Sequence, residues 1–192
     1  MKNSLEKYIR EKVENPSKEE IQEILDIFEL RYFNKKELIK RPFTISKEIG
    51  FLVEGNVRAV FYKKDGEKAT FRILQENNFV GDIISIKMQE ATPIAFESMN
   101  KVTILITSIE KMHDLLKRNL ALNIVMREHI ANTAMELGRR HLLFLTGNAK
   151  ERYQFILEQN PNLFKEFPLH LIASLIGITP TQLSRIRNKN SD

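Results

Sequence analysis

The sequence predicts an α+β protein in which an N-terminal antiparallel β-roll of jelly-roll type is followed by a long helix and a small helical segment. Two observations lead to this prediction. Apolar residues alternate with polar ones in several short runs between residues 31 and 107, whereas the flanking stretches repeat them at helical spacing. The 192 residues, 42% of them hydrophobic and 29% charged, suffice for one large or two small domains with a buried core.

The composition excludes several classes of function. The chain contains no cysteine, so disulfides, thiolate metal sites, iron–sulfur clusters and a cysteine nucleophile are ruled out together. The first residues lack the apolar stretch of a signal peptide, and every apolar run is too short to span a bilayer. We therefore expect a cytoplasmic protein with no membrane partner.

The charge is unevenly distributed along a chain whose formal net charge is +5. Residues 1–30 hold 5 basic and 8 acidic side chains, whereas residues 139–192 hold 8 basic and 4 acidic ones. A basic C-terminal third favours a polyanionic partner only weakly, because excess Lys and Arg also solvate ordinary surfaces.

Local signals place the first elements. Ser17 and Glu20 fit a capping box, and apolar residues at helical spacing follow them, which predicts an amphipathic helix. Residues 57–62 and 68–73 alternate on either side of Asp65-Gly66, a hairpin turn signal. Further short strands are expected over residues 51–53, 94–96 and 102–106.

A long helix is predicted over residues 120–145, after a short helix over 109–117 that Ser108 caps. Six of its residues fall at alternating spacings of four and three and form a heptad seam. They are Met126, Ile130, Thr133, Leu137, Arg140 and Phe144. This face either packs on the roll or meets a second copy, and the helix is too long for a small roll to cover. We therefore predict a homodimer through this seam.

Residues 169–188 have the layout of a helix-turn-helix. Ala173 is small where two helices must approach closely, and Gly177 suits the left-handed conformation of a tight turn. Thr179 is the expected cap of the second helix, with Pro180 at its first position. Apolar residues on both helices then form a buried contact: Ile172, Ile176, Ile178, Leu183 and Ile186.

The outer face of the second helix is polar or basic, which suits insertion into the major groove of DNA. Thr181, Gln182 and Arg185 are expected to face base edges, with Thr179 and Ser184 beside them. Arg187, Lys189 and His170 are expected to contact phosphates. The predicted partner is double-stranded DNA with a palindromic operator. A helical hairpin without a nucleic-acid role is the alternative, since such hairpins are common.

The order of these elements resembles the Crp/Fnr family of bacterial transcription regulators. The resemblance rests on residues 52–58, 64–68, 78–82 and 176–186. It implies a cyclic-nucleotide-binding-like sensor roll over residues 1–118, a dimerisation helix over 119–146 and a DNA-binding domain of winged-helix type over 147–192. Few residues follow the second helix, so a wing is either absent or supplied by residues before Leu169.

The resemblance also implies an effector pocket, formed here by Gly81, Asp82, Thr92 and Pro93. Nucleotide-binding members carry Gly-Glu and then Arg-Ser, whose arginine pairs with the cyclic phosphate. This chain has Gly81-Asp82 and Thr92-Pro93 in their place. No cation is expected near Asp82, whose carboxylate repels a phosphate. The predicted effector is therefore a small molecule other than cyclic AMP, or there is none.

The sequence does not predict an enzyme, a cofactor or a metal site. A cupin-like metal enzyme needs histidines on strands, but His113, His129, His141 and His170 all fall in predicted helices. His129 and His141 are read as interface or surface residues, and the roll offers no obvious haem ligand. The alternative to a DNA-binding regulator is a small-molecule-sensing module that regulates a partner protein without binding DNA.

Overall fold

The computed structural model describes residues 1–188 of the chain. Two helices, α1 (Lys2–Lys12) and α2 (Lys18–Asp26), precede the first strand. The Ser17 side chain accepts a hydrogen bond from the backbone N–H of Glu20, and the Glu20 carboxylate accepts one from the backbone N–H of Ser17. The predicted capping box is thus confirmed.

Eight strands form a roll of two antiparallel four-stranded sheets. One sheet has the order β1-β8-β3-β6 and the other β2-β7-β4-β5. The strands are β1 (Glu29–Phe33), β2 (Leu38–Lys40), β3 (Glu48–Glu54), β4 (Val57–Tyr62), β5 (Lys68–Leu74), β6 (Phe79–Val80), β7 (Ile94–Ser98) and β8 (Val102–Ser108). The predicted antiparallel roll is confirmed, and a short helix α3 (Ile83–Met88), which the sequence did not indicate, follows β6.

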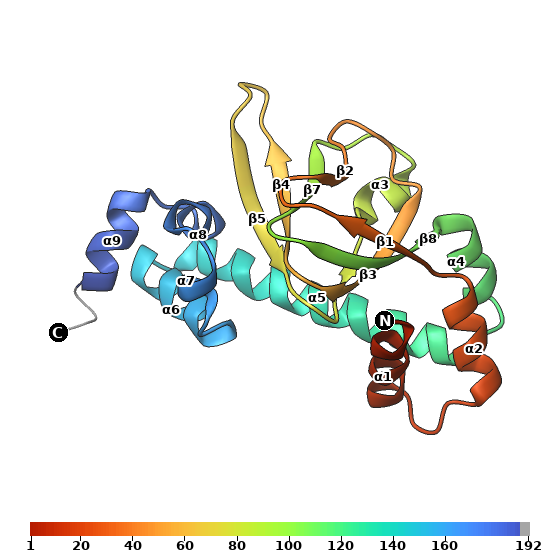
Figure 1. Cartoon of the computed structure of the whole chain (residues 1–192). Helices are drawn as coiled ribbons and strands as arrows, with labels where there is room; N and C mark the ends of the chain where they lie inside the picture. Colours follow the sequence, from red (N-terminus) through yellow and green to blue (C-terminus); the bar gives the residue numbers. More distant parts are fainter. Residues whose placement is uncertain (189–192) are drawn as a thin grey trace.

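The hairpin of β4 and β5 protrudes from the roll (Figure 1). Its turn contains Gly66 at φ +85°, which fits the Asp65-Gly66 signal. The pairing is irregular in the middle of β5. Ala59 pairs with Arg72 and Val60 with Thr70, so Phe71 has no partner on β4. This bulge interrupts the alternation that the sequence predicted for β5.

The core consists of three groups of buried side chains. The first joins α1, α2, α4 (Ile109–Leu116) and the start of α5 to Phe51 and Phe79 of the roll. The second fills the space between the two sheets and includes Leu52 and Ile104, both fully buried. The third holds the C-terminal helices together.

The long helix α5 (Leu120–Thr146) runs beside the roll, from the N-terminal helices to the C-terminal ones (Figure 1). The Asn119 side chain accepts a hydrogen bond from the backbone N–H of Leu122 and so caps its start. At 1.5 Å per residue, its 27 residues span about 40 Å. The helix predicted over residues 120–145 is confirmed.

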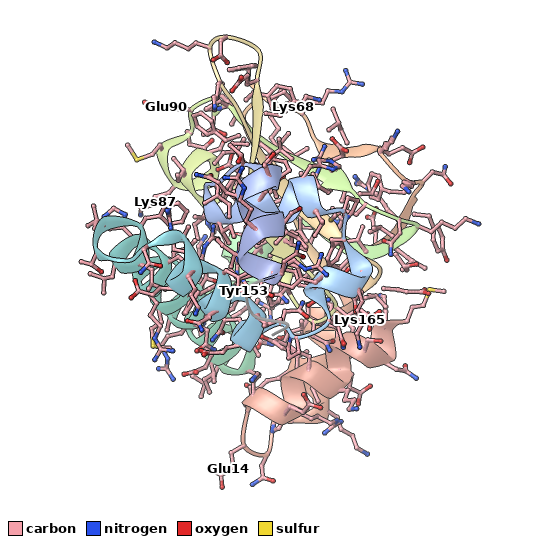
Figure 2. The ribbon with its side chains drawn as sticks, turned by 90° about the vertical axis from the view of Figure 1, so that its left-hand side faces the viewer. Glu14, Lys68, Lys87, Glu90, Tyr153 and Lys165 are labelled. Carbon is pink, nitrogen blue, oxygen red and sulfur yellow. The ribbon has the colours of Figure 1, made fainter. Side chains whose placement is uncertain are left out.

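The C-terminal segment contains α6 (Ala149–Gln159), α7 (Leu163–Glu166), α8 (Leu169–Ile176) and α9 (Pro180–Asn188). Between residues 147 and 188 the structure has helices and no strand, so a wing of the winged-helix type is not seen there. Figure 2, in which these helices face the viewer, shows them in front of the roll, below Lys68 of the hairpin. None of the helices described over residues 1–188 has the length and apolar character to cross a bilayer.

Candidate functional site

A cavity of about 270 Å³ lies between the roll and α5. Its wall is formed by residues of strands β3 to β7, helix α3 and α5. Most of its lining is apolar, including Ile84 of α3, Phe71 of β5 and Ile130 of α5. The charged side chains that line it are Arg72 and Asp82, and His129 lines it as well.

Asp82 occupies the position that the sequence assigned to an effector pocket, and its side chain is almost completely buried. It caps α3 by accepting a hydrogen bond from the backbone N–H of Ser85. Its Oδ2 lies 2.8 Å from Nζ of Lys40 in β2, and the Thr92 hydroxyl donates a hydrogen bond to the same oxygen. The carboxylate is therefore both paired and hydrogen-bonded, as burial of a charge requires.

Lys40 corrects the expectation that no cation stands near Asp82. Its Nζ also donates to Oγ1 of Thr92 at 3.1 Å and to the carbonyl oxygen of Ile94 at 2.8 Å. The Lys40 ammonium thus donates two hydrogen bonds and forms an ion pair with Asp82. The cation is present, but it is held by groups of the protein itself.

The other two residues of the predicted pocket have backbone roles. The Pro93 carbonyl accepts a hydrogen bond from the backbone N–H of Tyr62 at 2.9 Å. A Cβ on Gly81 would lie 3.1 Å from Cγ1 of Ile49, so the backbone just after β6 lies close to the Ile49 side chain of β3. The structure therefore brings Gly81, Asp82, Thr92 and Pro93 into one region, joined by Lys40, which the sequence did not indicate.

Arg72, His129 and Thr133 are the other polar side chains that line the cavity. Nη2 of Arg72 lies 2.7 Å from Oε2 of Glu136 on α5 and 3.4 Å from Oγ1 of Thr133. The His129 ring stands edge-on to Phe79, with ring centroids 5.1 Å apart. Burial, with a smaller contribution from Arg72, lowers the pKa of His129 to about 4, so the imidazole is neutral at pH 7.

The six residues of the predicted seam do not share one environment in the single chain. Met126 belongs to the core, Thr133 faces Arg72, and Arg140 is turned toward β5 and α8. Ile130, Leu137 and Phe144 stay between 40 and 46% exposed. The first three therefore contribute to packing within the chain, while the last three form an apolar face that remains accessible.

The C-terminal helices are connected to β5 by hydrogen bonds. The Ser174 hydroxyl of α8 accepts a hydrogen bond from the backbone N–H of Thr70 at 2.9 Å. The Arg140 guanidinium of α5 donates to the carbonyl of Phe71, at the bulge, and to the carbonyl of Leu175 in α8. The strand that forms one wall of the cavity is thus also the strand on which α8 rests.

The turn between α8 and α9 has the local chemistry that the sequence predicted. Gly177 adopts φ +67° and ψ +40°, the left-handed conformation. The backbone N–H of Gln182 donates to Oγ1 of Thr179, and the Gln182 side-chain oxygen accepts from the backbone N–H of Thr179. Ala173 and Leu183 are completely buried between the helices. The buried contact, the glycine turn and the Thr179 cap are confirmed.

The residues expected to contact DNA lie mostly at the surface. The exposed ones are His170, Thr179, Thr181, Gln182, Ser184 and Arg185. The guanidinium of Arg187 lies 5.6 Å from the ring centre of Phe164. Gln182 uses its side-chain oxygen in the cap of α9, a role that the sequence did not indicate. Lys189 lies outside the described residues.

The roll is similar to a known class of domain. Residues 30–119 match the family model of the cyclic nucleotide-binding domain, which is a little less than half of the chain. This match covers the strands, α3 and α4 and ends at the start of α5.

Solved structures extend the likeness to the whole fold. A CooA mutant from Carboxydothermus hydrogenoformans superposes with a TM-score of 0.72 at 18% identity, over 86% of this chain and 77% of that one. FixK2 from Bradyrhizobium japonicum superposes with a TM-score of 0.68 at 19% identity, over 85% of this chain and 84% of that one. The Thermus thermophilus Catabolite Activator Protein superposes with a TM-score of 0.59 at 16% identity, over 96% of this chain and 86% of that one. Identities this low establish the shared fold alone. No curated protein sequence is similar to this chain.

Proposed function

We propose that the chain is a dimeric, sequence-specific DNA-binding transcription regulator of the Crp/Fnr type, in which α8 and α9 act as a helix-turn-helix. The observation that carries the proposal is the α8–α9 pair itself. Its inner face is apolar and closed around Ala173 and Leu183, while the outer face of α9 offers Thr181, Ser184 and Arg185 to solvent. A helix of this kind fits the major groove.

Arg185 is the strongest candidate for reading a base. It is exposed on α9 and has no ion pair with any residue between 1 and 188. An arginine can donate two hydrogen bonds to guanine in the major groove. Thr181 lies one turn earlier on the same face. The side-chain oxygen of Gln182 is occupied in the cap, so Gln182 offers mainly its amide N–H groups.

The proposed regulator is a homodimer through α5. The exposed apolar face of Ile130, Leu137 and Phe144 supports this. Covering an apolar stripe on a long helix with a second copy removes it from water, which stabilises the dimer. A two-fold dimer would read an inverted repeat whose half-sites lie about one helical turn apart.

The proposed effector site is the cavity between the roll and α5, and its ligand is not cyclic AMP. A cyclic phosphate needs a free cation, whereas Lys40 is committed to Asp82, and Arg72 to Glu136. Strand β5 supports a route from this cavity to the proposed DNA-binding helices. It forms part of the cavity wall, its Thr70 N–H donates a hydrogen bond to Ser174 of α8, and its Phe71 carbonyl accepts one from Arg140 of α5.

The test is selection of bound sequences from random DNA, followed by salt-titrated binding to the selected operator. Arg185→Ala should weaken binding by roughly 1 to 3 kcal/mol and relax the preference at one base pair of each half-site. Lys47→Ala, which removes a charge from the roll, is the matched control. It should change neither the affinity for DNA nor the base-pair preference. Lys189→Ala should weaken all sequences alike and lower the salt slope by about one.

Two results would contradict the proposal. If selection enriches no sequence, the alternative of a module that regulates a partner protein is favoured. If Arg185→Ala retains full affinity and unchanged selectivity, the major-groove role of α9 is wrong.

A further inference from the structure

The cavity between the roll and α5 has a lining whose chemistry restricts its ligand. Each charged side chain in that lining already has a partner of opposite charge. Asp82 is 2.8 Å from Lys40, and Arg72 is 2.7 Å from Glu136. A charged ligand would have to break one of these pairs and leave a buried charge without its partner, which is costly.

Most of the remaining lining is apolar, with Thr133 of α5 as a further polar side chain, and the apolar residues come from β3 to β7, α3 and α5. Ile83 and Ile84 of α3 are 57% and 55% exposed, an unusual exposure for two adjacent isoleucines. They share this cavity with Phe71, Ile94 and Leu137. An apolar ligand would cover these side chains and gain about 25 cal/mol for each Å² removed from water.

One polar group in the cavity has hydrogen-bonding capacity to spare. The His129 imidazole forms no hydrogen bond with any residue between 1 and 188, although most of its ring is buried against Phe79. A neutral imidazole has one donor and one acceptor nitrogen. A ligand with a single hydroxyl, carbonyl or N–H group could satisfy one of them.

We infer that this cavity binds an uncharged, largely apolar small molecule, large enough to contain an aromatic ring, that makes one hydrogen bond to His129. The volume fits, because a dry protein cavity of about 150 Å³ accommodates benzene, and this cavity has about 270 Å³. The inference deepens the proposed function, since it names the class of effector to which the regulator responds.

The test uses the full chain and N-phenyl-1-naphthylamine, an uncharged aromatic amine that fluoresces strongly in apolar surroundings. We expect saturable binding of one probe per chain, with no displacement by excess cyclic AMP. Ile84→Asp places a carboxylate at the cavity wall and should raise the dissociation constant at least tenfold. Ile45→Asp is the matched control, because Ile45 is 44% exposed and lies outside the lining, and it should leave the dissociation constant unchanged.

A second measurement guards against a misfolded variant. In the unaltered protein, the ring-proton resonances of His129 should shift when the probe is added, whereas those of His113, exposed on α4, should not. The inference is overturned if no saturable binding occurs, as when side chains of a second copy fill the cavity. It is also overturned if cyclic AMP displaces the probe, if both aspartate variants lose binding equally, or if the His129 resonances do not move.

Failure of this inference and failure of the proposed function are distinguishable. Probe binding without any enriched DNA sequence would leave the ligand class standing and refute the DNA-binding role. An enriched operator without probe binding would do the reverse. Arg185→Ala should bind the probe with unchanged affinity, because Arg185 lies on α9 and does not line the cavity.

Discussion

Nη2 of Arg140 in α5 donates a hydrogen bond to the carbonyl oxygen of Leu175 in α8, over a distance of 3.1 Å. Nη1 of the same guanidinium donates to the carbonyl of Phe71. Phe71 is the bulged residue of β5 and has no partner on β4. One side chain on the long helix thus joins the roll to the C-terminal helices.

Replacing Arg140 by methionine should loosen this junction. Two carbonyl groups lose a charged donor, and we expect the free energy of unfolding to fall by roughly 1 to 3 kcal/mol. Urea unfolding measures this change, and limited proteolysis should cut the segment between α5 and α8 faster. Arg139→Met is the control, because Arg139 is exposed and should tolerate the change. Equal stability of the two variants would show that the junction does not depend on Arg140.

Removing Lys40 should be more damaging than removing the whole ion pair. Lys40→Met leaves the Asp82 carboxylate buried without its cation, and loss of one partner of a buried pair costs about 3 to 5 kcal/mol. Lys40→Met combined with Asp82→Asn should recover a large part of that loss. Thermal unfolding of the two single variants and the double variant forms a double-mutant cycle. Additive effects would contradict a direct coupling between Lys40 and Asp82.

The stability of the protein should fall on mild acidification because of His129. Its pKa is lowered from 6.5 to about 4 in the folded chain, so between these values the unfolded chain binds the proton more readily. The contribution is fully present above pH 6.5 and decreases as the pH falls toward 4. At pH 5 we expect a loss on the order of 1 to 2 kcal/mol.

His129→Phe should remove this part of the pH dependence, while the matched His113→Phe variant on exposed α4 should retain it. Chemical unfolding at pH 7 and pH 5 measures how steeply the free energy of unfolding of each variant changes with pH. A slope in His129→Phe that equals the slope of the unaltered protein would refute the assignment.

A charge in the exposed face of α5 should separate the proposed dimer. Leu137 is 40% exposed, and Leu137→Glu would place a carboxylate in the contact and yield monomers. Sedimentation velocity at micromolar concentration distinguishes the two states. Asn132→Glu adds the same charge at an exposed position of α5 outside the predicted seam and should remain dimeric. An unaltered protein that sediments as a monomer would refute the dimer itself.

Features that depend on neighbouring residues were predictable from the sequence. The capping box of Ser17 and Glu20, the hairpin turn at Gly66 and the left-handed turn at Gly177 each depend on a few consecutive residues. The long helix follows from a helical period that continues up to Gly147. Such signals are local, so no knowledge of the tertiary structure is needed to recognise them.

The chemistry of the cavity depends on contacts between distant parts of the chain and was therefore missed. Lys40 approaches Asp82 because β2 pairs with β7, and β7 begins two residues after Thr92, which binds Asp82. His129 has an unremarkable place in the helical pattern, and only the packing of α5 on the roll brings it beside Phe79. The bulge at Phe71 likewise has no sequence signal, because polar and apolar residues alternate without interruption over residues 68–73. A lysine in a predicted strand, followed downstream by a Gly-Asp pair, is the signal to look for in similar sequences.

Strand β5 both lines the cavity and contacts α8, which limits how this protein can be recombined with others. A chimaera that takes its C-terminal helices from another protein of this fold, joined after α5, would present a foreign α8 to the backbone N–H of Thr70, which here donates to the Ser174 hydroxyl, and to Arg140, which here donates to the Leu175 carbonyl. Exchanging β5 to restore that fit would replace Phe71 and Arg72 and so change the cavity wall. If α8 and α9 bind DNA and the cavity binds the effector as proposed, ligand preference and DNA-binding specificity are linked through this one strand, and a functional graft needs the β4–β5 hairpin to be transferred with the helices.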